Sequence, residues 1–302
     1  MTMNAPMKSH PIRRIIEPWL VGVVILTYAI GIGIAYHLGT RLDWINLFLG
    51  LLGVISIIET RNFLSAYFDH PETPVSTLHR DDPWYDELRA IKRPALMQIA
   101  LTVLTAGATV AVILIFRNVL TGACALLYSF AFLLGFFAAS PPMRLEKNGY
   151  GELIEALLVA NFIPAIALVL QGRPLTSYLV MLTLPLTLIY LAMKIAHSFE
   201  GYAFQITHSS KTLVTQLGWQ RSMRLHNLLI IAAYLLMSIF GLVGLSWSSV
   251  WPMLLGLPLG GFQIFLIQRI EEGDKPRWRL LKLVSAGLFL LTVYFILLTL
   301  WI

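Results

Sequence analysis

The sequence contains few charged residues and a single cysteine. Charged side chains make up 13% of its 302 residues, whereas roughly 25% is usual in a soluble domain, so an ordinary soluble globular fold is excluded. Cys124 has no second cysteine to pair with, which excludes an intrachain disulfide, and nothing indicates metal–thiolate chemistry. The sequence also lacks low-complexity segments and an obvious internal repeat, and the latter disfavours many transporters built from inverted repeats.

Apolar residues are abundant in this sequence. They form 57% of the chain and gather in runs of roughly 20 residues, a length that crosses a hydrocarbon core of ~30 Å. The first run is too long for the core of a signal peptide and many further runs follow it, so we expect no cleaved signal. The nine predicted spans lie at about residues 17–38, 44–69, 94–116, 119–139, 151–171, 174–200, 223–246, 250–268 and 279–301.

The predicted fold class is therefore all-α. We expect a polytopic membrane protein in which nine transmembrane helices form one bundle around an inward-facing cavity, with a single membrane domain over residues 1–302.

Basic residues are distributed unevenly between the two sides of the predicted bundle. One side carries 17 Lys and Arg, and the other carries three, Arg41, Arg117 and Arg173. The positive-inside rule then places a short arm (1–16) and the loops 70–93 and 201–222 in the cytoplasm and the C-terminus outside, which indicates a protein of the cytoplasmic (inner) membrane. The net charge of +6 follows from this bias and suits anionic lipid or phosphate, and it requires no nucleic acid.

Polar residues interrupt the cytoplasmic ends of spans two and six. On span two, Glu59, Asn62 and Asp69 fall on one helical face together with Ser65 and Ala66. Span six carries a similar row of polar residues, which are Lys194, His197 and Glu200. Polar groups at membrane depth are unfavourable unless they face a cavity or a partner, so these two faces are the first candidates for a functional site.

Both polar faces lie at the same end of the predicted bundle. With spans two and six as neighbours, Asp69 and Glu200 would face each other across the cavity. Mg²⁺ takes one or two protein carboxylates and completes its shell with water and phosphate oxygens, and Lys or Arg neutralises charge on a leaving diphosphate. The alternative is structural: Lys194 would pair with Glu59 or Glu200, His197 would be a packing residue, and Asp69 would be a plain helix end.

The end of span two resembles a known motif. The stretch Asn62-Phe63-Leu64-Ser65-Ala66-Tyr67-Phe68-Asp69 is similar to the first Asp-rich motif of the UbiA superfamily of intramembrane prenyltransferases, which typically reads Asn-x-x-Asn-Asp-Tyr-Phe-Asp. Those enzymes have nine spans and two Asp-rich cytoplasmic motifs, which follow spans two and six. In this chain, Ser65 and Ala66 replace the second Asn and the first Asp of the motif.

Further segments resemble the same family in the same order. The matches before span five are Pro142, Arg144, Lys147, Gly149 and Gly151-Glu152, and those after span six are Glu200-Gly201, Lys211-Thr212-Leu213 and Leu217-Gly218. His197, Ser198 and Tyr202 stand where the second motif has Arg, Asp and Asp, and the spacing from Glu200 to Thr212 is longer than usual. The whole pattern is most similar to the menaquinone branch, which prenylates 1,4-dihydroxy-2-naphthoate.

The resemblance implies an enzyme that uses Mg²⁺ to move a prenyl group from a prenyl diphosphate to an aromatic or other lipophilic acceptor, in contact with membrane lipid. It assigns catalytic roles to Asp69 and Glu200, diphosphate binding to Asn62, Arg144, Lys147, Lys194 and Lys211, and metal binding to Asp69, Glu200 and Glu72. Lys194 would supply positive charge where metal charge has been lost, and Asp81 and Asp82 are candidate replacement carboxylates.

A second interpretation comes from a different class. The substitutions at the expected Asp positions, Ala66, Ser198 and Tyr202, favour a non-catalytic relative that binds a lipid or quinone or serves as a subunit of a larger complex. The retained Asp69, Glu200, Arg144 and Lys147 argue against complete loss of the site.

Overall fold

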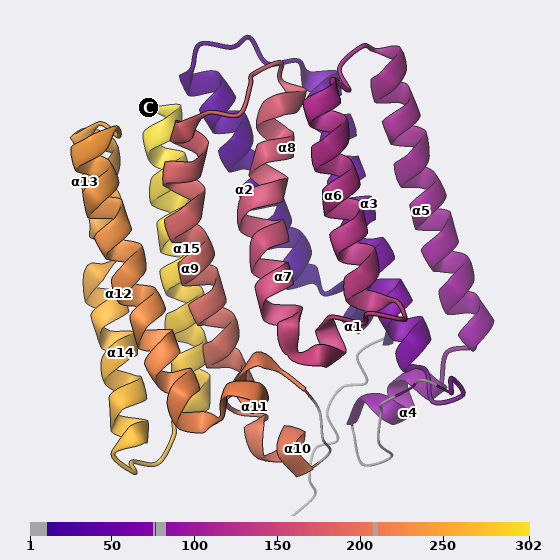
Figure 1. Ribbon diagram of the computed structural model, residues 1–302, viewed down its shortest axis with the longest axis vertical. Coiled ribbons are helices and arrows are strands. Elements are labelled where there is room, and N and C mark those ends of the chain that lie inside the picture. The colour runs from indigo at the N-terminus through magenta and orange to yellow at the C-terminus, as the bar shows by residue number, and fades with distance from the viewer. Residues whose placement is uncertain (1–10, 75, 77–82, 208–210) are drawn as a thin grey trace, which may run out of the picture.

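A computed structural model describes residues 11–74, 76, 83–207 and 211–302. Asp81, Asp82 and the first ten residues of the predicted arm lie outside the described residues. Within the described ranges every element is a helix (Figure 1). Nine segments there are long and apolar enough to cross a membrane, which confirms the predicted fold class. They are Ile12–His37, Trp44–Asp69, Arg93–Phe116, Gly122–Ala139, Glu146–Leu170, Ser177–Ser198, Trp219–Val243, Trp247–Glu271 and Trp278–Trp301.

The long helices account for most of the bundle. In chain order they are α2 (Pro18–His37), α3 (Trp44–Asp69), α5 (Arg93–Phe116), α6 (Gly122–Ala139), α9 (Ser177–Ser198), α12 (Trp219–Val243), α14 (Leu257–Glu271) and α15 (Trp278–Trp301). Shorter helices complete it: α1 (Pro11–Ile16), α4 (Pro83–Arg89), α7 (Gly151–Leu157), α8 (Ile163–Leu170), α10 (Tyr202–Thr207), α11 (Leu213–Leu217) and α13 (Trp247–Leu254). Of two π-helical turns, η1 (Glu146–Tyr150) begins the fifth span and η2 (Leu158–Phe162) interrupts it.

Several predicted spans differ from the observed helices for local reasons. The fourth starts at Gly122 rather than near residue 119, because the Thr121 side chain caps the helix by accepting a bond from the N–H of Cys124. The eighth is two helices, α13 and α14, with Pro252 and Gly256 near the break. A hydropathy pattern reports the length of an apolar segment but not an interruption inside it.

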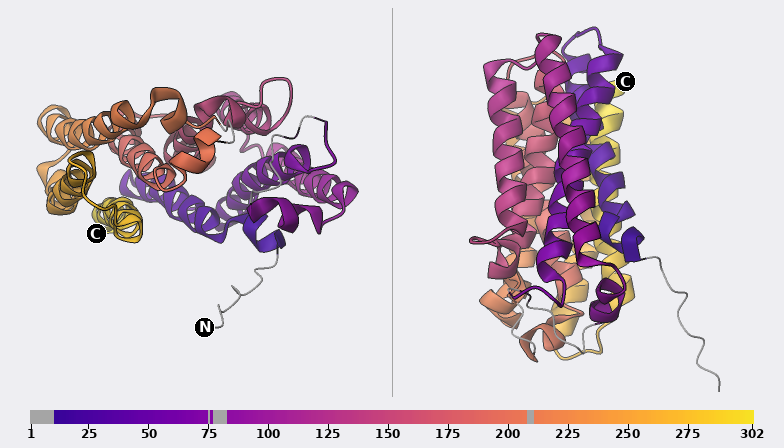
Figure 2. Two further views of the ribbon diagram at one scale, coloured as in Figure 1. Left: turned by 90° about the horizontal axis from the view of Figure 1, so that it is seen from below. Right: turned by 90° about the vertical axis from the view of Figure 1, so that its right-hand side faces the viewer.

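The fifth span lies at the centre of the bundle. It is the most buried of the nine, whereas α5 is the least buried and stands at one edge of the molecule (Figure 1). The close contact between the fifth span and α2 depends on Gly31, because a Cβ added there would lie 2.1 Å from the carbonyl oxygen of Pro164. Seen end-on in Figure 2, α12 and α14 lie at the other edge of the bundle.

The two ends of the bundle differ in character. One end, hereafter the loop end, carries α1, α4, α10 and α11 together with the ends of α3 and α9 (Figure 1). The chain finishes at the opposite end, where short connections join the spans (Figures 1 and 2). The predicted placing of both polar helix ends at one end of the bundle is confirmed.

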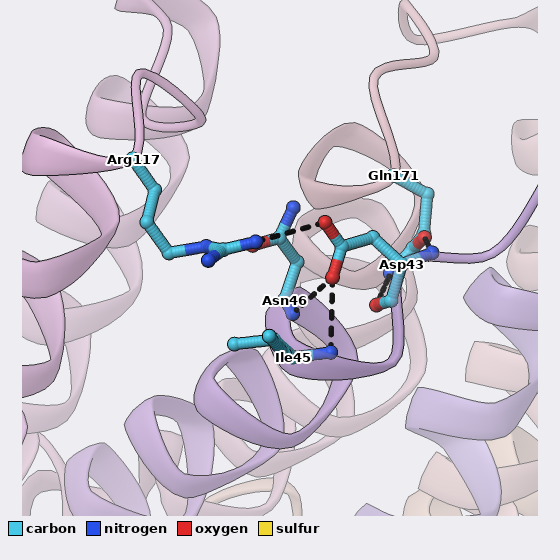
Figure 3. Close-up of polar contacts among 5 residues, drawn as sticks. All are labelled: Asp43, Ile45, Asn46, Arg117 and Gln171. Carbon is cyan, nitrogen blue, oxygen red and sulfur yellow. Dashed lines mark hydrogen bonds and ion pairs between the residues drawn. The ribbon is translucent and has the colours of Figure 1, made fainter.

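Polar side chains fasten the connections at the opposite end (Figure 3). The Oδ1 atom of Asp43 accepts bonds from the N–H groups of Ile45 and Asn46, at 2.9 and 3.1 Å, and caps α3. Its Oδ2 atom lies 2.9 Å from Nη2 of Arg117, and its own N–H donates to Oε1 of Gln171 at 2.9 Å. The bond from the Asn46 N–H, together with the Arg117 guanidinium, lowers the pKa of the Asp43 carboxyl below its ordinary value. One residue, Asp43, thus ties together three connections through its carboxylate and its backbone.

Replacing Asp43 should separate its two roles. Asp43→Ala removes the helix cap and the ion pair, and we expect it to lower the free energy of unfolding by about 1 kcal/mol, the usual value of an N-cap. Asp43→Asn keeps a capping oxygen and should lose much less. Because the folded-state pKa is lowered, the difference between wild type and Asp43→Asn should be present at neutral pH and vanish as the pH falls through that pKa. Unfolding in mixed detergent micelles measures the free energy of unfolding of each variant and its dependence on pH. Equal losses of that free energy in Asp43→Ala and Asp43→Asn would contradict the capping role.

Candidate functional site

A polar cavity of about 340 Å³ opens at the loop end of α3. Its walls come from α1, the start of α2, α3, α4, η1 and α7. The polar residues that line it include Glu17, Arg61, Asn62, Asp69, Glu146 and Glu155. Helical spacing explains the contribution of α3, since Asn62, Ser65, Ala66 and Asp69 project from one side of the helix.

Asp69 is the acidic residue at the rim of this cavity. Its Oδ1 atom is ion-paired with Nη2 of Arg144, and its Oδ2 atom lies 2.7 Å from Nζ of Lys147. The Asp69 side chain is 8% exposed and that of Lys147 is 36% exposed, so the pair spans from the buried wall to the opening. Two of the four cations that the resemblance assigns to diphosphate binding therefore converge on one of the two carboxylates that it assigns to catalysis.

The backbone between α6 and α7 brings those two cations to Asp69. Arg144 has a φ of 39°, in the left-handed region that is uncommon for a residue other than glycine. Gly149 has a φ of 83°, and a Cβ there would lie 2.4 Å from the side chain of Gln216. Glycine is thus required at this turn, and Gln216 fastens it to α11 by donating a bond to the carbonyl oxygen of Asn148.

A network of buried ion pairs forms the deeper wall. The Nε atom of Arg61 bonds to Oε1 of Glu146, and its Nη2 atom lies 3.5 Å from Oε2 of Glu155. Lys194, on α9, lies 3.1 Å from Oε1 of Glu155, and the hydroxyl of Tyr190 donates to the same oxygen at 2.6 Å. The network therefore joins α3, η1, α7 and α9 across the bundle.

Burial makes this pairing obligatory. The side chains of Arg61 and Glu155 are 7% and 8% exposed, and an ion taken out of water without a partner costs several kcal/mol. Glu155 compensates two cations at once, so its carboxylate holds the inner side of the site together. Arg61 keeps one nitrogen, Nη1, that is buried and has no partner.

A neighbouring polar contact connects the site to the segment after α9. Glu152, in the first turn of α7, accepts a bond from the hydroxyl of Ser198 at 3.2 Å and one from the N–H of Leu213 at 3.3 Å. It therefore holds α7, α9 and α11 together at the loop end.

The structure brings some of the predicted site residues together and leaves others apart. Asn62 and Asp69 line the cavity, Arg144 and Lys147 reach it through Asp69, and Lys194 reaches it through Glu155. The remaining three are not lining residues: Glu200 is ion-paired with Lys282, Glu72 is 71% exposed beside His70, and Lys211 is exposed. Their roles stay predictions. The structural pairing considered for Lys194 was wrong, because its partner is Glu155 rather than Glu59 or Glu200.

Sequence reasoning missed two acids of the network, Glu146 and Glu155. Glu155 lies inside the predicted fifth span, and an acidic residue at membrane depth is itself a signal of a functional or pairing role. Glu146 carried no such signal, because it lies in a loop. Among the described residues, no group of three or more His, Cys, Asp or Glu could hold a metal ion.

Removing the charge of Glu155 should be strongly destabilising. Glu155→Gln leaves the partly exposed Lys194 and part of the buried Arg61 without compensation, and we expect a loss of about 3–5 kcal/mol in the free energy of unfolding. The matched control is Glu152→Gln on the same helix, whose partners are neutral and which should lose less than about 1.5 kcal/mol. Detergent unfolding of the purified variants measures both. Similar losses would show that Glu155 acts as an ordinary hydrogen-bond acceptor.

Comparison with known proteins places this geometry in a known fold. No protein-family model matches the sequence, and no curated protein matches it. Solved structures do match. A UbiA homologue from Archaeoglobus fulgidus bound to DMAPP and Mg²⁺ is 14% identical with a TM-score of 0.62, and the match covers 95% of this chain and 99% of that one.

Two further structures agree. Digeranylgeranylglyceryl phosphate synthase is 13% identical with a TM-score of 0.64, over 92% of both chains. The apo UbiA homologue from Aeropyrum pernix K1 is 12% identical with a TM-score of 0.59, over 91% of this chain and 95% of that one. At this level of identity the likeness concerns architecture: the chain has the fold of the UbiA homologues over nearly its whole length.

Proposed function

We propose that this protein is an integral membrane prenyltransferase. It transfers a prenyl group from a prenyl diphosphate to an aromatic or other lipophilic acceptor. The observation that carries the proposal is the convergence of Arg144 and Lys147 on Asp69 at a polar cavity. Solved structures of the same fold include one bound to DMAPP and Mg²⁺ and one bound to GPP and Mg²⁺, which supports a prenyl diphosphate as the donor.

Arg144 and Lys147, the cations at the rim of the cavity, are suited to binding a diphosphate. Transfer breaks the bond between the first prenyl carbon and the diphosphate oxygen, forms a bond from that carbon to the acceptor, and releases a proton from the acceptor. Charge therefore develops on the diphosphate, where fixed Arg and Lys donors stabilise it. Arg144 and Lys147 already approach each other on Asp69, so phosphate oxygens that replace the carboxylate would meet both donors. Asn62 adds a further donor, since its Nδ2 atom is buried without a partner.

The donor set fits one Mg²⁺ ion rather than a cluster of them. Mg²⁺ is commonly held by one or two carboxylates, with water and substrate phosphates completing the shell. Asp69 lines the cavity and would hold the ion once the diphosphate engages Arg144 and Lys147. The ion would neutralise charge on the leaving diphosphate. Glu200, Glu72 and Lys211, at the same end of the bundle, remain candidates for completing the site.

The acceptor follows from resemblance alone. We propose a ring such as a naphthoate, in keeping with the menaquinone branch, with the prenyl chain among the apolar parts of the helices. The deeper cations, Arg61 and Lys194, are engaged by Glu146 and Glu155 and act as supports for the cavity. Lys194, whose side chain is 27% exposed, still adds positive charge to its inner wall.

A non-catalytic binding role is the second candidate. One observation favours it: at the positions where the resemblance expects Asp, Ala66 packs in an apolar cluster and Ser198 bonds to Glu152. Such a protein would keep the cavity for a lipid or quinone without turnover.

Prenyl transfer by the purified protein tests the proposal. We expect Mg²⁺-dependent product with an allylic diphosphate and an aromatic acceptor. Asp69→Asn, Arg144→Met and Lys147→Met should each lower kcat by about 10²–10³, the usual effect of removing one such charge-stabilising group. The control is Arg221→Met, an exposed arginine at the same end that does not line the cavity. Diphosphate binding without product from any donor and acceptor would favour the binding role, and absence of both would contradict the proposal.

We also propose that the cavity opens to the cytoplasm, as the positive-inside rule indicates. Single cysteines in a Cys124→Ala background test the orientation. Leu175→Cys lies in the connection between α8 and α9 at the opposite end, and Glu272→Cys lies in the connection after α14 at the loop end. A membrane-impermeant maleimide should label the first in intact cells and the second only after permeabilisation. The reverse pattern would contradict the orientation.

A further inference from the structure

A second cavity lies at the loop end, between α14 and α15. Its volume is about 510 Å³, and it shares no lining residue with the candidate functional site. The two helices that form it run side by side, and their connection turns at the loop end of the bundle (Figure 1). This cavity belongs to a part of the molecule that the proposed chemistry does not use.

Positive charge surrounds the opening of this cavity. Its lining includes Arg269, Lys275 and Arg277 against a single acid, Asp274. Arg269 engages that acid, with Nε 2.7 Å from Oδ2. Lys275 and Arg277 are exposed and make no ion pair with any residue in the described part of the chain. The neighbouring Glu271 and Glu272 do not line the cavity.

These cations differ from those of the candidate functional site. There, Arg61, Lys147 and Lys194 are each bound to a carboxylate of another element. At the second cavity the two cations nearest the α14–α15 turn are left available to an external anion. Topological bias explains why the loop is basic, but it does not explain why two of its cations line a hollow.

The inner wall of the same cavity is apolar. It is built by Phe262, Phe265, Leu266 and Ile270 of α14 and by Leu280 and Leu281 of α15. The rings of Phe262 and Phe265 are stacked with centroids 6.4 Å apart, and these residues are 41% and 51% exposed. The guanidinium of Arg269 lies 5.8 Å from the Phe265 ring centroid. From Arg269 to Phe262 the wall descends about 10 Å into the span, given 1.5 Å per helical residue.

An occupant must therefore combine an anionic group with hydrocarbon. A soluble polyanion would leave the phenylalanine wall uncovered, and an uncharged lipid would leave Lys275 and Arg277 without a partner. We propose that this cavity binds the head group of an anionic phospholipid, with the phosphodiester on Lys275 and Arg277 and an acyl chain along Phe262 and Phe265. Basic pockets between transmembrane helices at the cytoplasmic surface are a known way of holding such lipids.

Native mass spectrometry of the protein released from nanodiscs tests the proposal. The discs contain equal amounts of phosphatidylglycerol and phosphatidylcholine with the same acyl chains. We expect phosphatidylglycerol to be retained in preference. The double variant Lys275→Gln/Arg277→Gln should weaken that retention about 25-fold, since each basic residue near an anionic surface is worth about fivefold. The matched control, Arg221→Gln/Arg224→Gln, removes two exposed cations at the same end that do not line the cavity.

Lipid retention by the two double variants decides whether the site exists. Preference for phosphatidylglycerol that is lost in the first double variant and kept in the control supports the site. Equal retention of the two lipids, or equal loss in both double variants, overturns it, because the effect would then be absent or a general property of the basic surface. Glycerol phosphate supplies a further test: displacement of the lipid by this head group alone, at matched concentration, would overturn the role of the phenylalanine wall. Unchanged thermal unfolding of the variants in lipid-free detergent confirms that they fold.

Discussion

The rest of the bundle depends on how its buried charges are paired. Arg61 and Lys194 lie on different helices within the spans, and Glu155 on the central fifth span faces both. In a low-dielectric interior these groups must be compensated where they lie, because moving any of the three helices apart would leave an ion unpaired. Apolar contacts between transmembrane helices are weakly selective, since lipid is equally apolar. The ion pairs therefore specify which helices adjoin and keep a polar cavity open among them.

The pairing also separates the cations into two groups that differ in how readily they can leave their carboxylate to bind a ligand. Arg61 is the ion-pair partner of Glu146, and Arg61 and Lys194 share Glu155. Giving Arg61 to a ligand would leave Glu146 uncompensated, and giving Lys194 to a ligand would leave Glu155 with only the 3.5 Å contact to Arg61. Arg144 and Lys147 instead share Asp69 at the rim, where Lys147 is partly exposed. An arriving anion can take over those two donors while a metal ion or water compensates Asp69. The arrangement thus favours ligand exchange at the rim and rigidity beneath it.

The sequence alone supported more of the fold than of the site. Span number follows from apolar length, and the sidedness that we predict follows from the placing of Lys and Arg; both are properties of single segments. Asn62 and Asp69 could also be predicted as site residues, because helical spacing puts them on one face of the helix. The ion-pair partners of the buried acid could not be predicted from the sequence. Glu155 pairs with residues 94 positions before it and 39 after it, and only the lateral order of the helices decides such a contact. The breaks at η2 and between α13 and α14 were missed for a related reason, since apolar composition continues through them.

The residues at the positions where the resemblance expects acids make structural contacts. Ser198 donates to Glu152, and the hydroxyl of Tyr202 accepts a bond from the N–H of Trp219. Ala66 packs with Ile15 and Phe63. Two of the acids that line the cavity, Glu146 and Glu155, each face a cation rather than one another. Clustered carboxylates repel unless metal ions lie between them, whereas carboxylates interleaved with Arg and Lys form a stable wall by themselves. A site built in this second way needs less metal to hold its shape, and it leaves Asp69 as the carboxylate best placed for the ion expected with the proposed prenyl diphosphate.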